Sequence, residues 1–218
     1  MKLTEMDKIE LFELVKEYFG WFSADFRDDR KSYFWDEYKA RRLDELGFEY
    51  SSGAAKYCIF LPEWYDVVIK FCYDKEFDYC EREYENYCAA VCEGVAQYFP
   101  YTDYLGTNNG IRFYVQQVAY VDECDVYDSL YDKLNESGSF EDLPYEDEYE
   151  RSEYISDWID DMEAEERVEL LFGDERLIEF IDHYHINDLH DGNFGKIDDA
   201  FVIIDFSGYG KYAMGREF

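Results

Sequence analysis

Three oxygen-bearing side chains near the carboxyl end of the chain have types and a spacing suited to phosphoryl transfer. Asp188 is followed five residues later by Asn193, and Asp205 comes twelve residues after that, at the end of the apolar run 201–204. Phosphoryl transfer needs one carboxylate to receive the proton of the attacking hydroxyl. It also needs an Asn and a second Asp to hold the magnesium that neutralises the phosphates. A loop followed by a short strand would aim all three groups at one point.

The segments that lead to this loop alternate between the helical period and the strand period. Thr4 and Asp7 have the pattern of a capping box, which predicts the start of the first helix. Glycine and asparagine at 106–110 predict a turn between two strands. Helices are predicted at 4–22, 31–46, 76–98, 126–134, 158–171 and 174–184, strands at 48–52, 55–61, 67–71, 101–105 and 111–121, and a loop at 135–151. This mixture predicts an α+β fold.

The composition predicts a folded and strongly acidic protein. The 218 residues are 47% hydrophobic and 21% aromatic, and the formal net charge is −32 at pH 7. Acidic disordered chains are poor in aromatic residues, and this length suffices for one domain or two small lobes with a core. The charge predicts no direct binding to nucleic acids or anionic membranes, and attraction to basic protein surfaces. The amino-terminal residues lack the apolar run of a signal peptide, so a cytoplasmic protein is expected.

The cysteine pattern predicts reduced thiols. None of the six cysteines forms a CxxC pair, and the chain is not a small secreted scaffold. Cys88 and Cys92 are one helical turn apart, but the three histidines are distant from them in sequence. Core or surface thiols are therefore expected rather than metal ligands.

Two motifs resemble those of a known superfamily. The segment Asp188-Leu189-His190-Asp191-Gly192-Asn193 resembles the catalytic loop of aminoglycoside and choline phosphotransferases, which belong to the protein-kinase-like superfamily. Ile203-Ile204-Asp205-Phe206-Ser207 resembles the segment with the magnesium-binding Asp of the same superfamily. The resemblance implies a two-lobed fold with an antiparallel sheet and one helix in the amino-terminal lobe. It also implies ATP as the phosphoryl donor, Asp188 as the catalytic base, and Asn193 and Asp205 as Mg²⁺ ligands.

The resemblance requires a strand Lys that contacts the phosphates and a helix Glu that holds it. Lys70 lies in the apolar segment 67–71, where alternation leaves it facing a cleft or solvent. The following helix offers Glu83, which is preferred because Tyr87 lies one turn further on, and Glu85 as the next choice.

Two further nucleotide-binding positions follow from the same resemblance. Gly53 lies in a turn of small residues, where the superfamily has a glycine-rich loop over the phosphates. Val121 lies where the hinge that pairs with adenine is expected. The predicted organisation is a helical extension at 1–47, an amino-terminal lobe at 48–121, and an acidic connector with a reduced helical lobe at 122–218.

The chain also departs from the superfamily pattern. Ile186 stands where a His is usual, and Asn187 is not the Arg that couples catalysis to activation-loop phosphorylation in many protein kinases. Thirteen residues follow Asp205, so the platform for the acceptor is expected to be missing or built from the first helices. The small size suits a phage or mobile-element product that acts in the host cytoplasm.

Two alternatives to an enzyme of this kind are weighed. His183, His185, Asp188 and His190 suggest a metallohydrolase, but their spacing does not match that motif and leaves Asn193 unexplained. Acidic residues outnumber basic ones by about nine to one over 122–166, where aromatic residues also occur. This segment suggests a catalytically silent binding protein that imitates DNA and inhibits a basic nucleic-acid-binding or host-defence protein.

Overall fold

The computed structural model describes residues 2–20, 41, 43–52, 56–72, 78–137 and 148–208, in two compact units. Unit 1 comprises Met1–Cys92 and Pro100–Val118, and unit 2 comprises Glu93–Phe99 and Ala119–Phe218. The first helix therefore shares a unit with the sheet, whereas the sequence predicts a boundary at residue 47. Within the described residues, no helix combines the length and the apolarity that are needed to cross a membrane.

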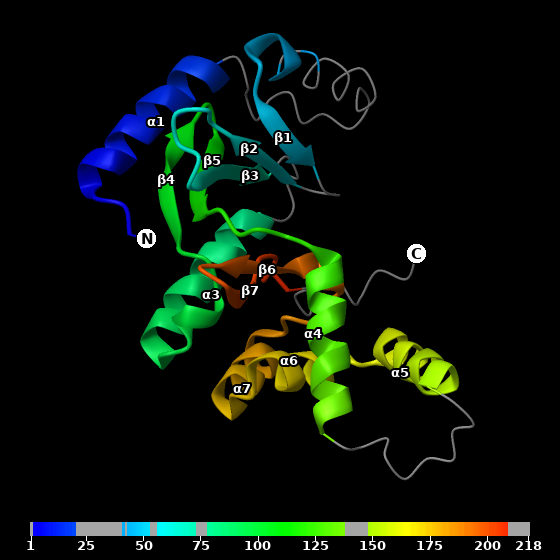
Figure 1. Cartoon of the computed structure of the whole chain (residues 1–218). Helices are drawn as coiled ribbons and strands as arrows, with labels where there is room; N and C mark the ends of the chain where they lie inside the picture. Colours follow the sequence, from blue (N-terminus) through cyan, green and yellow to red (C-terminus); the bar gives the residue numbers. More distant parts are fainter. Residues whose placement is uncertain are drawn as a thin grey trace, which may run out of the picture. The chain divides into compact units, whose positions relative to one another are not determined.

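Unit 1 is built on a five-stranded antiparallel sheet (Figure 1). Its strands are β1 (Glu49–Ser52), β2 (Lys56–Phe60), β3 (Val67–Cys72), β4 (Thr102–Asn108) and β5 (Ile111–Gln117). They lie in the order β1-β2-β3-β5-β4, so β3 is the central strand. Helix α3 (Tyr79–Glu93) follows β3 in the chain. The predicted α+β class and the antiparallel sheet are confirmed.

Strand β3 is buried along its whole length. On one face, Val67, Ile69 and Phe71 belong to the main core of the unit, together with Leu11 and other residues of α1. On the other face, Cys72 packs with Cys80 of α3 and Tyr114 of β5. Because successive side chains of a strand alternate between the faces, Lys70 also points to the α3 side.

Helix α1 (Glu5–Phe19) lies along β4 (Figure 1). The predicted capping box is present, with the Thr4 side chain bound to the backbone of Asp7 and the Asp7 side chain bound to the backbone of Thr4. Gly106 allows the close approach of β4, because a Cβ there would lie 2.4 Å from the Phe12 ring. Of the second predicted helix, 43–46 is helical and most of the rest lies outside the described residues.

The β4–β5 hairpin differs from its prediction in length. The turn consists of Asn109 and Gly110 alone, and both have positive φ, as a type I′ turn requires. The predicted turn at 106–110 is therefore too long, and β4 continues through Gly106 to Asn108. Strand β5 ends at Gln117 rather than at 121. Helix α3 ends at Glu93 rather than at 98, because Gly94 turns the backbone into the left-handed region.

Unit 2 contains four complete α-helices and a small hairpin within its described residues. They are α4 (Glu123–Glu136), α5 (Glu148–Asp161), α6 (Ala164–Phe172), α7 (Glu175–Tyr184), β6 (Phe194–Ile197) and β7 (Ala200–Ile203). The prediction of a loop to 151 and one helix at 158–171 is wrong. Helix α5 already begins at Glu148, and two non-helical residues separate it from α6. The side chain of Arg167, on α6, donates to the carbonyl oxygens of Ile159 and Met162. It thereby provides hydrogen-bond partners for carbonyls at the end of α5 that lack them within the helix.

Candidate functional site

The segment after α7 forms a short loop held by buried side chains. His185 ends the helix in a left-handed conformation, and its N–H donates to the carbonyl oxygens of Ile181 and Asp182. Ile186 and Leu189 are then buried on either side of the half-buried Asp188. Ile186, which departs from the superfamily pattern, therefore serves as an apolar anchor of the loop. Anchors on both sides fix the backbone at Asp188.

Asn193 closes this loop onto Asp188. Its Nδ2 donates to the carbonyl oxygen of Asp188 over 2.6 Å, and its backbone N–H donates to the carbonyl of His190 over 2.8 Å. Asn193 is 8% exposed. Because Nδ2 is used inside the loop, the remaining oxygen Oδ1 is the atom of this side chain that can accept a hydrogen bond or bind a cation.

The β6–β7 hairpin returns the chain to Asn193. Phe194 pairs with Ile203, and the N–H of Ile204 donates to the carbonyl oxygen of Asn193 over 2.9 Å. Asp205 is the next residue, and its Oδ1 accepts a hydrogen bond from Ser207 Oγ over 3.2 Å. The structure thus brings the Asp188–Asn193 loop and the Asp205 segment to the same end of one hairpin. Amide and carboxylate oxygens are ligands that Mg²⁺ accepts.

Two residues that the sequence analysis does not identify support this arrangement. Gly208 has φ +64°, and a Cβ there would lie 2.4 Å from the carbonyl oxygen of His185, so the segment after Asp205 packs directly on the loop. Arg167 of α6 forms an ion pair with Asp191 inside the loop. Arg167 follows a strongly acidic segment, and such a rare basic residue is the sequence signal that could have identified it as a partner of the loop.

Unit 1 contains a buried ion-pair cluster at Glu83. Lys70 Nζ lies 2.8 Å from one carboxylate oxygen of Glu83, and Lys56 Nζ lies 2.5 Å from the other. Glu83 is 0% exposed and Lys70 is 5% exposed. The ion pair that the sequence predicts between the strand Lys and Glu83 is present, whereas Glu85 is exposed. The prediction that Lys70 could face solvent is wrong, because Lys70 is 5% exposed and its ammonium is paired with Glu83 of α3.

Lys56 is the member of this cluster that the sequence analysis does not identify. It begins β2, and its register partner on β3 is Cys72, two residues from Lys70. Cys72 and Lys70 are two residues apart on β3 and therefore share a face of the sheet. Lys56, directly opposite Cys72 on β2, lies on that same face, so Lys56 and Lys70 both reach the carboxylate of Glu83. Lys56 could be predicted as a partner of Glu83 only if the register between β2 and β3 were already known.

The sequence predicts two further nucleotide-binding positions, Gly53 and Val121. Gly53 lies outside the described residues. Val121 belongs to unit 2 and is 41% exposed. It follows Tyr120, whose backbone exchanges two hydrogen bonds with Lys196 of β6, at 2.9 and 2.7 Å. The segment predicted as a hinge is therefore bridged to the β6–β7 hairpin.

The histidine cluster of the metallohydrolase alternative does not assemble. Among the described residues, the one group of three or more possible metal ligands is Cys72, Asp78 and Cys80. His190 Nδ1 instead accepts the N–H of Gly192 within the loop, at 3.2 Å. His183 packs edge to face on the ring of Tyr184.

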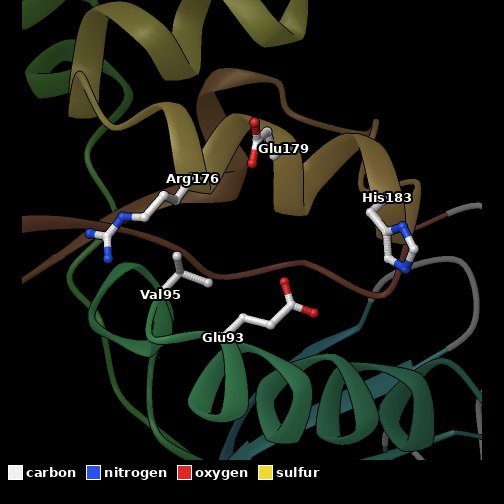
Figure 2. Close-up of a pocket in the computed structure, with 5 residues that line it drawn as sticks. All are labelled: Glu93, Val95, Arg176, Glu179 and His183. Atoms are coloured by element: carbon white, nitrogen blue, oxygen red, sulfur yellow. The ribbon is translucent and has the colours of Figure 1, made fainter.

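Unit 2 also contains a pocket (Figure 2). It is lined by Glu93, Val95, Arg176, Glu179 and His183. The last three come from α7, and Figure 2 shows the Glu93 side chain on the opposite side of the space. Its charged groups have both signs, and none of the residues predicted for phosphoryl transfer lines it.

No family model, curated protein or solved structure matches the chain.

Proposed function

We propose that the protein is a kinase-like phosphotransferase that uses ATP and Mg²⁺ to phosphorylate a hydroxyl group of a protein or a small molecule. The observation that carries this proposal is the buried ion pair between Lys70 and Glu83. In protein kinases the phosphate-binding Lys lies on the third strand and pairs with a Glu of the next helix. Here Lys70 lies on β3 and Glu83 on α3, the helix that follows it.

The loop in unit 2 supports the same proposal. Asp188 is half-buried in a loop whose backbone is fixed by Asn193, as a base that must receive a hydroxyl proton requires. Asn193 and Asp205 would hold Mg²⁺ through Oδ1 and a carboxylate oxygen. When bound, the ion would offset the charge of the phosphates. Most of the rate enhancement would come from positioning and electrostatics.

In unit 1, Lys70 and Lys56 would contact the phosphates. The ammonium of each lysine donates a hydrogen bond to Glu83. Glu83 fixes the position of both charges before any ligand arrives, so less side-chain entropy is lost on binding. Two ammonium groups thus converge on one carboxylate within a protein of net charge −32.

A thermal-shift titration with ATP and Mg²⁺ tests this function. A ligand that binds the native state raises the apparent melting temperature with its concentration. We expect a Mg²⁺-dependent shift in the wild type that Asp205→Ala and Lys70→Met each abolish. Asp182→Ala removes an exposed carboxylate of α7 and serves as the control that keeps the shift. The absence of a shift in the wild type at millimolar ATP would exclude the mechanism.

The surface of α5 favours a second candidate function, an acidic binding protein. Tyr149, Tyr154 and Trp158 are 74%, 42% and 46% exposed on this helix. Exposed carboxylates accompany them, namely Glu150, Glu153, Asp157, Asp160 and Asp161. Aromatic residues are enriched in protein interfaces, and the carboxylates would attract a basic partner. Asp188→Ala separates the two functions, because it abolishes a biological effect that needs catalysis and leaves one that needs only binding.

A further inference from the structure

Two buried thiols and a carboxylate converge where β3 ends and α3 begins. Cys72 and Cys80 are each 1% exposed, and their sulfur atoms are 3.5 Å apart. Asp78 lies just before α3, and one of its carboxylate oxygens and the two sulfurs all lie within 4.8 Å of one another. These three donors come from segments that the helix–strand packing brings together.

The Cys72 thiol donates a hydrogen bond to Cys80 Sγ, and the separation of the two sulfurs shows how far they are from a disulfide and from a shared metal ion. In a disulfide the sulfurs are about 2.05 Å apart. Two thiolates bound tetrahedrally to Zn²⁺, each at about 2.3 Å, are about 3.8 Å apart. The observed 3.5 Å is within a few tenths of an ångström of the second arrangement. A metal ion between the sulfurs therefore needs little rearrangement, whereas a disulfide needs a movement of more than an ångström.

The surroundings of Asp78 are those of an oriented ligand. One oxygen accepts the backbone N–H of Glu81 over 3.0 Å, and the other lies 3.7 Å from the guanidinium of Arg112. Such partners hold a ligating carboxylate in place. The Asp78 side chain is 22% exposed, so this side of the cluster gives an ion and a water molecule a path from solvent. Tyr114 packs against the two thiols.

We propose that Cys72, Asp78 and Cys80 form a binding site for Zn²⁺, with water as the fourth ligand. Two thiolates select a borderline-soft ion such as Zn²⁺ over Mg²⁺ or Ca²⁺, which prefer oxygen. On binding, the two thiol protons pass to solvent. Cys72 lies two residues after Lys70, and Cys80 lies three residues before Glu83. The ion thus ties β3 to α3 beside their ion pair, whether or not the protein transfers phosphate.

Cobalt serves as the spectroscopic probe of this site. The full chain carrying Cys88→Ser and Cys92→Ser, which removes the two exposed thiols of α3, is freed of metal with a chelator and titrated with Co²⁺. We expect one equivalent to bind with thiolate-to-cobalt charge-transfer absorption, and Zn²⁺ to displace it. In this background Cys72→Ser and Cys80→Ser should each abolish the absorption. Absorption that is absent, or that survives both substitutions, would overturn the proposal.

Two further measurements cover the case in which a core cysteine variant fails to fold. Zn²⁺ should raise the apparent melting temperature of the Cys88→Ser, Cys92→Ser protein, and Mg²⁺ should not. Asp78→Asn removes a partly exposed ligand, and it should weaken Co²⁺ binding about tenfold or more while the charge-transfer band persists. No stabilisation by Zn²⁺, or unchanged Co²⁺ affinity in Asp78→Asn, would overturn the three-residue site.

Discussion

Lys56 and Glu83 form an ion pair across 27 positions of the sequence, on the carboxylate that also binds Lys70. Glu83 therefore acts as the junction of β2, β3 and α3 in unit 1. A buried carboxylate with a cation on each oxygen is held in one orientation, and it holds both cations in turn. The first two predictions follow from this junction.

Glu83→Ala should destabilise the protein by about 3–5 kcal/mol, because it leaves two ammonium groups without the buried carboxylate between them. Glu85→Ala is the matched control on the same helix, since Glu85 is exposed. That variant should stay within about 0.5 kcal/mol of the wild type. Urea unfolding measures both. Similar midpoints for the two variants would mean that Glu83 does not join the elements.

Lys56→Met should weaken ATP binding about tenfold or more, as Lys70→Met should, since a hydrogen bond to a charged group contributes about 1.5–3 kcal/mol. Lys16→Met removes a charge that pairs with Glu13 on α1 and controls for the general loss of positive charge. Isothermal titration with ATP and Mg²⁺ gives the affinities. If Lys70→Met loses binding and Lys56→Met keeps it, Lys56 serves only to orient Glu83.

Gly208→Ala should destabilise the protein more than Gly94→Ala does. Both glycines have positive φ, which costs an Ala about 1–2 kcal/mol. A Cβ at Gly94 meets nothing within 4 Å, whereas one at Gly208 would lie 2.4 Å from the carbonyl oxygen of His185. Overpacking adds about 1–3 kcal/mol. Chemical denaturation of the two variants measures the difference, and equal losses would contradict the close packing of Gly208 on the loop.

Arg167→Lys should loosen the Asp188–Asn193 loop. The guanidinium joins Asp191 to the carbonyls of Ile159 and Met162, and one ammonium cannot reach all three. We expect faster amide exchange in the loop and a loss of about 1.5–3 kcal/mol in stability. Arg176→Lys is the control, because Arg176 is largely exposed and its ion pair with Asp174 spans only two positions of the sequence. Unchanged exchange at the loop would show that Arg167 is not its anchor.

Asp174 should make stability depend on pH in the acid range. Hydrogen bonds from Arg176 and then from Tyr98 hold the pKa of this carboxyl well below its ordinary value. A lowered pKa in the folded state means that the stabilisation is complete above about pH 4, the pKa of an unfolded Asp, and is lost as the pH falls further. The stability difference between wild type and Asp174→Asn should therefore shrink below that pH. Urea midpoints at several pH values measure it, and a constant difference would contradict the assignment.

Local sequence signals predict several elements because their causes are local. Thr4 and Asp7 are three residues apart and cap α1 as predicted, and Asn109-Gly110 forms its turn through its own backbone preference. The choice of Glu83 over Glu85 also follows a local rule, since a helix buries one face in every turn. The break between α5 and α6 escapes such rules, because the guanidinium that ends α5 comes from α6.

The sequence by itself determined the order of the five strands of unit 1 and of α3 among them, and the identity of the residues suited to phosphoryl transfer. Periodicity, turn residues and motif spacing depend on a few neighbouring positions, so they can be read from the sequence alone. Only the tertiary structure decided that Lys56 shares Glu83, that Cys72 meets Cys80, and that Arg167 anchors Asp191. Those contacts depend on strand register and helix packing, which are set by burial of the whole core rather than by any one segment.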